Sequence, residues 1–257
     1  MLAYLTVPVC VAAEVFESSY ASYKSGLNGS EMIEAVLCDI DGTLVQSNWL
    51  HASAWKDAFS ITGVEVELEE VRRQIGKGGD ELIPVFIPWW KRKSVEEPLK
   101  KYRQYIFRAD YLSQVKPFPK ARELLVRMKE AGIKVSLASS AHQEEIKSYR
   151  KIADIDDLVE ESTSADDAKQ SKPHPDIFLA TLKKLGLPPG KVLALGDTPY
   201  DAEAAGKAEI WTVGVTTGGW SERDLLGAGC IEVYKDVEEL LACFEQSAFC
   251  MLGTGSG

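Results

Sequence analysis

Short apolar segments alternate with amphipathic segments through the second half of this 257-residue chain. The segments with strand character are 134–138, a short one near 157–160, 191–195 and 210–215, and those with helical spacing are 119–131, 142–150, 176–185 and 200–207. Strands that are separated by helices join as a parallel sheet with helices on both faces. The sequence therefore predicts an α/β fold with a doubly wound parallel sheet.

The first strand of this kind ends in two acids, Asp39 and Asp41, which are followed by Gly42 and Thr43. Residues two apart in a strand point to the same side, so both carboxylates are expected to face one space. One carboxylate can attack phosphorus while the other transfers a proton. Gly42 permits a sharp turn, and Thr43 offers a hydroxyl and an N–H to a phosphate oxygen. A plain Asp-Gly turn explains the same residues without chemistry.

Further polar side chains follow the later strands. Ser139 and Ser140 follow the strand 134–138. Lys172 lies just before a helix, and Pro173 and Pro175 after it restrict the backbone. Asp197 and Asp201 follow the strand 191–195. In a doubly wound sheet, ligands bind outside the carboxyl ends of the strands. We therefore expect these side chains to meet at one site.

The acids in this set suit a magnesium ion. Asp39, Asp197 and the main-chain carbonyl of Asp41 provide the hard oxygen ligands that Mg²⁺ prefers. Two roles are open for Asp201: a further ligand, or a partner that holds Lys172 and a metal-bound water. Each residue alone also fits a turn, a cap or a solvated surface. Their joint occurrence at strand ends favours a site.

Residues 49–116 interrupt the α/β pattern with helical periodicity. We expect helices over 51–61 and 94–113, the second with Ser94 as its N-cap in a capping box. Between them, Arg73 and Lys77 lie in a basic, glycine-rich loop. The sequence therefore predicts a small helical domain inserted after the first strand.

The charge balance limits the partners. The chain has 39 acidic and 29 basic residues, a net charge of -10, which argues against nucleic acid or an anionic membrane as the main partner. Its five cysteines are odd in number and form no Cys-x-x-Cys pair, which favours a reduced, cytoplasmic setting. We expect residues 1–31 to be a poorly ordered extension or an upstream mis-start, and 246–257 to be a flexible tail.

The four motifs, in this order, resemble those of the haloacid dehalogenase-like (HAD) hydrolase superfamily, in the helical-cap branch that includes phosphoglycolate phosphatases and β-phosphoglucomutases. The resemblance implies a Rossmann-like core over 32–48 and 117–245 and a cap over 49–116. It implies that Asp39 is the nucleophile, Asp41 the general acid and base, and Lys172 the charge-neutralising group. The phosphate binders are then Gly42, Thr43, Ser139 and Ser140, and the Mg²⁺ ligands Asp39, Asp41 and Asp197.

The implied activity is Mg²⁺-dependent hydrolysis of a small phosphomonoester through an aspartyl-phosphate. Members named for dehalogenation lack an acid at the position of Asp41, and the mutases of this branch usually carry Glu at the position of Gly196. A β-phosphoglucomutase-like sugar-phosphate mutase is the alternative, and a non-catalytic binding module is a third possibility. The expected partner is a small phosphorylated metabolite whose far end meets Arg73 or Lys77. The oligomeric state is open.

Overall fold

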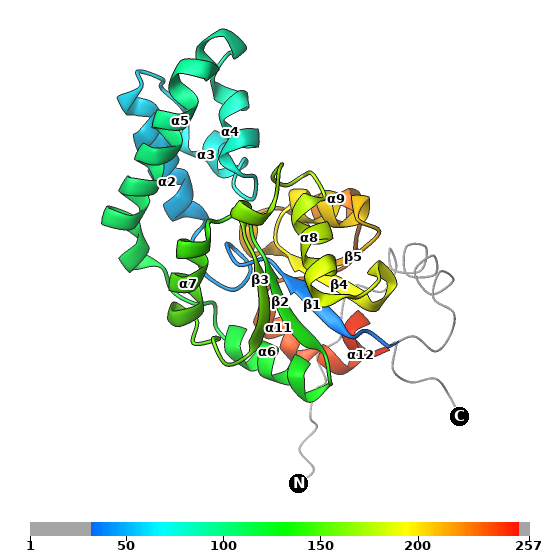
Figure 1. Cartoon of the computed structure of the whole chain (residues 1–257). Helices are drawn as coiled ribbons and strands as arrows, with labels where there is room; N and C mark the ends of the chain where they lie inside the picture. The colour runs from blue at the N-terminus through cyan, green and yellow to red at the C-terminus, as the bar shows by residue number, and fades with distance from the viewer. Residues whose placement is uncertain (1–31, 252–257) are drawn as a thin grey trace, which may run out of the picture.

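A computed structural model of the chain describes residues 32–251, so the expectations for residues 1–31 and 252–257 lie outside the described residues. Six strands form one parallel sheet in the order β3-β2-β1-β4-β5-β6 (Figure 1). The strands are β1 (Ala35–Cys38), β2 (Lys134–Ala138), β3 (Val159–Thr163), β4 (Val192–Gly196), β5 (Trp211–Val215) and β6 (Cys230–Tyr234). The predicted fold class is confirmed.

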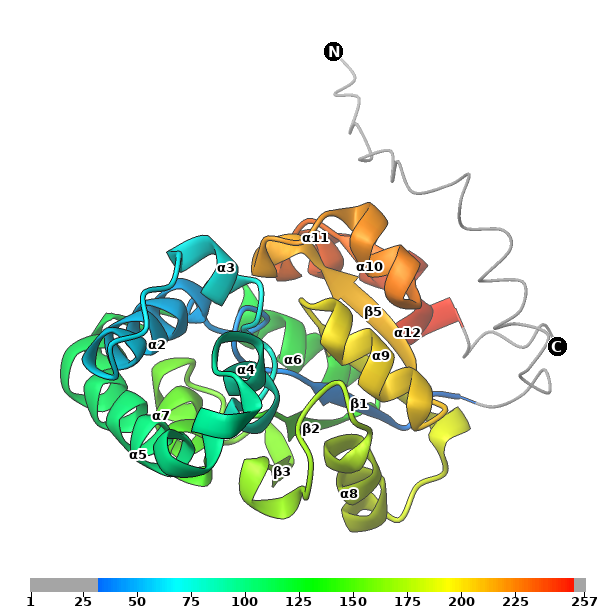
Figure 2. The same ribbon diagram turned by 90° about the horizontal axis from the view of Figure 1, so that it is seen from above.

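Helices cover both faces of the sheet (Figure 2). They are α6 (Ala121–Glu130), α7 (Gln143–Ile152), α8 (Asp176–Leu185), α9 (Pro199–Lys207), α10 (Glu222–Ala228) and α11 (Val237–Ala242). Buried residues of α6, α7 and α11 share one apolar cluster with the sheet, whereas those of α8, α9 and α10 lie in two other clusters. The result is the three-layer arrangement expected of a doubly wound sheet.

Strand β1 lies at the centre of the sheet, and its side chains alternate between the layers. Val36 and Cys38 pack in the cluster that contains α6, whereas Ala35 and Leu37 pack in the cluster that contains α8. The strand pairs with β2 on one side and with β4 on the other, and Asp39 N donates to Leu195 O just beyond its end. This is the switch point of the sheet, where ligands bind in folds of this class.

A group of helices follows β1 and lies beyond the carboxyl ends of the strands (Figure 1). It consists of α2 (Asn48–Ile61), α3 (Leu68–Arg72), α4 (Gly79–Phe86), α5 (Trp89–Ile106), a π-helical turn (Phe107–Tyr111) and a 3-10 turn (Leu112–Gln114). We call residues 48–114 the helical unit. Its core is a row of apolar side chains on α2, including Trp55, Ala58 and Phe59.

Two local predictions have wrong bounds, and one strand was not predicted. The long helix of this unit starts at Trp89, not at Ser94, and the residue with extended backbone that precedes it is Pro88. Ser94 lies inside the helix, where its Oγ donates to Lys91 O. Strand β3 begins two residues later than predicted and continues to Thr163. The segment Cys230–Tyr234, which carried no strand prediction, forms the edge strand β6.

The flexible tail was expected to begin at residue 246, and this boundary is too early. Ala248 and Phe249 are buried in the main apolar cluster, and they begin the short helix α12 (Ala248–Met251). The main-chain N–H of Ala248 also donates to the Glu232 carboxylate at 3.0 Å. Burial and this hydrogen bond anchor the segment to β6. Within the described residues, no helix combines the length and apolar character needed to cross a membrane.

Candidate active site

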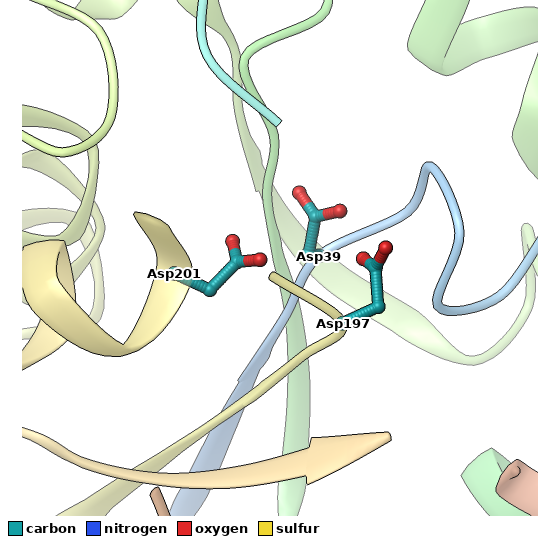
Figure 3. A group of neighbouring side chains, drawn as sticks. All are labelled: Asp39, Asp197 and Asp201. Carbon is teal, nitrogen blue, oxygen red and sulfur yellow. The ribbon is translucent and has the colours of Figure 1, made fainter. Parts of the chain in front are cut away.

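Three buried carboxyl groups meet at the carboxyl ends of β1 and β4. Asp39 follows β1, Asp197 follows β4, and Asp201 lies in the first turn of α9. One oxygen from each lies within 4.8 Å of the others. Figure 3 shows the three side chains converging on one space. The structure therefore brings together the acids that the strand-end pattern singled out.

Lys172 lies between two of these acids. Its Nζ is 2.7 Å from Asp39 Oδ1 and 2.7 Å from Asp201 Oδ1, and it donates to Ala138 O at 2.8 Å. The side chain is fully buried. Burial alone lowers the pKa of a lysine, but the two carboxylates raise the pKa of Lys172 above its usual range. The ammonium therefore stays charged.

Asp201 has a second, local role. Thr198 Oγ1 accepts from Asp201 N, and Asp201 Oδ2 accepts from Thr198 N at 3.0 Å, so the two residues form a capping box at the start of α9. The helix cap and the ion pair with Lys172 use different oxygens of one carboxylate. The helix cap and the ion pair together fix the orientation of the Asp201 carboxylate. Of the two roles open for Asp201, the structure shows the contact with Lys172.

Asp197 is held by hydrogen bonds on both oxygens. Thr43 Oγ1 donates to Oδ1 at 2.9 Å, and Asn48 Nδ2 donates to Oδ2 at 2.8 Å. Glycines pack closely around the same carboxylate: a Cβ on Gly42 or on Gly218 would lie 2.2 or 2.1 Å from Asp197 Oδ2. Gly42 also has φ +80°, a conformation that favours glycine. These close contacts explain the glycine after the second acid.

The acid cluster has a surplus of negative charge that one lysine does not cancel. Burial, more than any other cause, raises the pKa of Asp39 to about 7, with Lys172 opposing and Asp201 adding to the rise. Burial and the neighbouring carboxylates also raise the pKa of Asp197 well above its usual range. Three carboxylates against one ammonium leave room for a divalent cation, and oxygen donors suit a hard ion such as Mg²⁺.

Asp41 is turned toward the helical unit. Its Oδ1 accepts from Ser47 Oγ at 2.5 Å and lies 2.7 Å from His51 Nε2. Tyr149 OH lies 2.9 Å from the same His51 nitrogen. Burial opposes ionisation of Asp41, but His51, Ser47 and Arg103 together hold its pKa below its usual value. The carboxyl of Asp41 is thus separate from the acid cluster and has its own set of partners.

A cavity of about 270 Å³ lies between the helical unit and the sheet, and Asp39, Asp41, Ser139, Ser140 and Lys77 are among its lining residues. Ser139 Oγ accepts from Ala141 N, and Ser140 Oγ donates to the main-chain oxygen of the glycine-rich loop at 3.2 Å. The predicted phosphate-binding serines therefore face the space beside the predicted nucleophile.

The other two predicted phosphate binders, Gly42 and Thr43, are not lining residues of this cavity. The Thr43 hydroxyl donates to Asp197, as described above, and its N–H donates to Ile40 O at 3.2 Å. In this structure both of its donors are used inside the fold. Their observed role is to support Asp197.

The two predicted contacts from the helical unit differ in position. Lys77 lines the cavity, donates to Gln74 Oε1 at 2.7 Å and lies over the Tyr200 ring at 4.6 Å. Arg73 is not a lining residue; its guanidinium lies 5.4 Å from the Trp220 ring centroid, and its side chain is 56% exposed. Of these two predicted contacts, Lys77 is therefore the one placed to reach a ligand in the cavity.

The glycine-rich loop packs against several strand-end loops at once. A Cβ on Gly76 would lie 2.9 Å from Thr198 Oγ1, and one on Gly78 would lie 1.9 Å from Ser171 Oγ. Asp80 Oδ2 accepts from Ser171 N at 3.1 Å. The glycines therefore allow a close approach of the helical unit to the sheet layer, which closes the cavity on that side.

Several residues of the site were missed in the sequence, among them Asn48, His51, Arg103 and Glu145. His51 stacks on the Phe107 ring at 4.1 Å, and Arg103 forms an ion pair with Glu145 at 3.1 Å. The only available signal was weak: His51 is ten residues after Asp41, on the apolar face of the predicted first helix of the insertion. The partners come from different helices, so spacing along the chain does not connect them.

Comparisons with known proteins agree with this geometry. A profile of the family described as haloacid dehalogenase-like hydrolase matches residues 36–215. A PpaX protein of Caldanaerobacter subterraneus is 30% identical over 187 residues, which cover 71% of this chain and 81% of that protein. The Phosphorylated carbohydrates phosphatase of Thermotoga maritima is 29% identical over 210 residues, which cover 81% of this chain and 97% of that protein.

A solved structure is also similar. The crystal structure of a hydrolase from Pseudomonas syringae aligns with a TM-score of 0.73 at 27% sequence identity. The alignment covers 83% of this chain and 99% of that chain. The sheet and the helical unit described above thus occur together in a protein of known structure.

Proposed function

Because the chain belongs to the haloacid dehalogenase-like hydrolase family and is a hydrolase of phosphate esters, we propose that it is a Mg²⁺-dependent phosphatase of a small phosphomonoester, working through an aspartyl-phosphate on Asp39. The observation that carries this proposal is the position of Asp39. Its carboxylate lines the cavity, is neutralised by Lys172 at 2.7 Å and belongs to the acid cluster. This is the environment that a carboxylate nucleophile needs near an anionic substrate.

The residues divide the reaction into two displacements. In the first, an oxygen of Asp39 bonds to phosphorus, the ester P–O bond breaks, and the departing alkoxide takes a proton from the carboxyl of Asp41 in its protonated form, which its lowered pKa makes the minor form in the free protein. In the second, Asp41 takes a proton from water, the water oxygen bonds to phosphorus, and the acyl phosphate bond to Asp39 breaks. Lys172 offsets negative charge on Asp39 and on the phosphoryl oxygens throughout.

In this proposal Asp39, Asp197 and the main-chain carbonyl of Asp41 would hold the metal ion, and the support is that Asp39 and Asp197 belong to the acid cluster. A bound Mg²⁺ supplies Lewis-acid charge neutralisation of the phosphoryl group. Thr43 and Asn48 keep the Asp197 carboxylate in place for this purpose. Ser139 and Ser140 are the groups proposed to bind the non-bridging phosphate oxygens, and both line the cavity beside Asp39.

The helical unit then acts as the cap over a small phosphorylated metabolite, with residues 49–116 forming the cap and 32–48 with 117–245 the core. Its support is the partly open cavity of about 270 Å³ between the helical unit and the sheet, which is close to the lower end of the size range of small-molecule sites. Lys77 is the cap residue proposed to meet the far end of the substrate. A reduced, cytoplasmic setting suits Cys38, Cys230 and Cys250, which are free thiols.

The test is release of inorganic phosphate from p-nitrophenyl phosphate with and without Mg²⁺. The wild-type protein is expected to need Mg²⁺, and Asp39→Asn is expected to lose turnover while its circular dichroism spectrum stays the same and it is at least as stable as wild type. Asp110→Asn, at an exposed acid of the helical unit, is the matched control and should keep full activity. Unchanged turnover in Asp39→Asn would sink the nucleophile assignment.

A sugar-phosphate mutase remains the alternative, and one contact favours hydrolysis over it. A Cβ on Gly196 would lie 2.6 Å from the Asp201 Cβ, so a larger side chain there would have to displace the partner of Lys172. The resemblance noted above places a Glu at this position in mutases. Supplying β-glucose 1-phosphate separates the two activities, since a phosphatase releases phosphate whereas a mutase forms glucose 6-phosphate.

A further inference from the structure

Glu145 is a buried acid outside the acid cluster. It lies in the first turn of α7, one of the helices that cover the sheet, and its side chain is 1% exposed. Its Oε1 accepts a hydrogen bond from Arg103 Nη1 at 3.1 Å. Arg103 comes from α5 of the helical unit, so this ion pair joins the helical unit to the part of the fold that contains the sheet. An unpaired charge at so buried a position would be costly, which means that the pair is held together.

The other end of the Arg103 guanidinium contacts His51. Arg103 Nη2 donates to His51 Nδ1. The planar group lies 5.0 Å from the Phe107 ring centroid and 5.6 Å from that of Trp55, so aromatic rings limit its tilt. Glu145 on one side and two rings on the other thus direct one N–H of Arg103 at a single ring nitrogen of His51.

This contact decides which nitrogen of His51 carries hydrogen. A guanidinium has only donors, so His51 Nδ1 must accept, and the ring hydrogen is then on Nε2. His51 Nε2 lies 2.7 Å from Asp41 Oδ1 and can donate to it. The chain of contacts therefore runs from Glu145 through Arg103 and His51 to the proposed proton carrier Asp41.

We propose that Glu145 is a positioning residue for Asp41: it orients Arg103, which holds His51 in the form that donates from Nε2 to the Asp41 carboxylate. Tyr149, one turn further along α7, contacts His51 Nε2 at 2.9 Å, so α7 acts on this ring directly through Tyr149 and indirectly through Glu145 and Arg103. The functional part of this inference rests on the phosphatase activity proposed above. The structural part, the position of the ring hydrogen, does not.

The first experiment reads the ring hydrogen directly. In protein labelled with ¹⁵N-histidine, long-range ¹H–¹⁵N spectra distinguish a hydrogen on Nε2 from one on Nδ1, and His51→Gln identifies the resonance. We expect wild-type His51 to carry its hydrogen on Nε2, and Glu145→Gln to shift it toward a mixture of the two forms. Glu144→Gln, at the exposed neighbouring acid of α7, is the matched control and should leave the spectrum unchanged.

The second experiment uses kinetics. Because Glu145 acts on proton transfer, Glu145→Gln should lower kcat about tenfold or more and leave KM within about twofold. Arg103→Met should lower kcat by a similar factor, and the double variant should be no worse than Arg103→Met alone, since both changes break one relay. Multiplied losses in the double variant, or a raised KM with unchanged kcat, would overturn the relay.

The two proposals fail in different ways. A wild-type protein that releases no phosphate contradicts the phosphatase proposal, whereas the ¹⁵N spectra still test the relay. A wild-type His51 with its hydrogen on Nδ1, or a Glu145→Gln protein with an unchanged His51 spectrum and unchanged kcat, contradicts the relay alone. If Arg103→Met does not fold, the spectra of Glu145→Gln and Glu144→Gln decide the matter.

Discussion

Lys172 Nζ lies 2.7 Å from Asp39 Oδ1, although the two residues are 133 positions apart in the chain. The contact exists because both residues come from loops at the same edge of the sheet. Lys172 is also the single ammonium that contacts the acid cluster among the described residues. Much of the behaviour of the site should therefore depend on this one side chain.

Lys172→Met should destabilise the metal-free protein. The substitution leaves buried carboxylates without their counter-charge, and breaking a buried ion pair in this way costs about 3–5 kcal/mol. The loss is measured as the free energy of urea unfolding at pH 7.5 in the presence of a chelator. Lys151→Met, at an exposed lysine of α7, is the control and should change this free energy little. Equal stability of Lys172→Met and wild type would contradict the role assigned to the ion pair.

The metal-free protein should lose stability as the pH rises. The folded-state pKa of Asp39 is about 7, above the ordinary 3.8, so the folded protein keeps a proton that the unfolded chain releases. Stability from this group is fully present below about pH 4 and is lost as the pH rises through about 7. The total loss corresponds to roughly 4 kcal/mol.

The measurement is the difference in unfolding free energy between wild type and Asp39→Asn across this pH range. The difference should grow in favour of Asp39→Asn toward pH 7 and shrink when Mg²⁺ is added, since an ion that binds only the folded state stabilises it. A difference that stays constant with pH would show that the carboxyl group of Asp39 titrates normally.

Gly78→Ala should prevent the glycine-rich loop from packing against the sheet layer. The new methyl group would lie 1.9 Å from Ser171 Oγ and 2.6 Å from Ser171 Cβ, so the loop must move outward. We expect KM to rise by about tenfold. Gly227→Ala has no atom within 4 Å of its new methyl group and serves as the control.

A second substitution, Ser171→Gly, removes the side chain that the new methyl group would meet and should therefore rescue Gly78→Ala. If the clash with Ser171 is the cause, Gly78→Ala with Ser171→Gly should recover part of the affinity that Gly78→Ala alone loses. Kinetics of the four proteins over a range of substrate concentrations give this comparison. If the effects of the two single substitutions on KM simply add in the double variant, the clash with Ser171 is not the cause.

Glu232→Gln should stabilise the protein at high pH. This acid is 2% exposed, accepts from Tyr234 OH at 2.9 Å and from Ala248 N, and burial raises its pKa. A folded-state pKa above the unfolded value means that ionisation costs stability as the pH rises. The amide removes this pH-dependent cost, so the stability of Glu232→Gln relative to wild type should rise as the pH is raised from about 4 to 8. Thermal unfolding of Glu232→Gln and of the exposed control Glu160→Gln across pH measures it.

Local patterns were sufficient to predict much of the fold. Runs such as Val192 to Leu195 are wholly apolar because both faces of a central parallel strand are covered. The edge strand β6 was missed because Glu232 interrupts its apolar run, and only the packing of α12 shows why a buried acid is tolerated there. The start of α5 was misplaced because a polar Ser94 fits both a cap and an exposed helical position.

The sequence by itself determined which side chains meet at the acid cluster. The carboxyl ends of parallel strands share one edge, so Asp39, Lys172 and Asp197 could be placed together from their positions after strands. The tertiary structure decided what surrounds Asp41. Its contacts with His51, and those of Arg103 with Glu145, join α2, α5 and α7, and helix packing angles are not encoded in the spacing of residues along one segment.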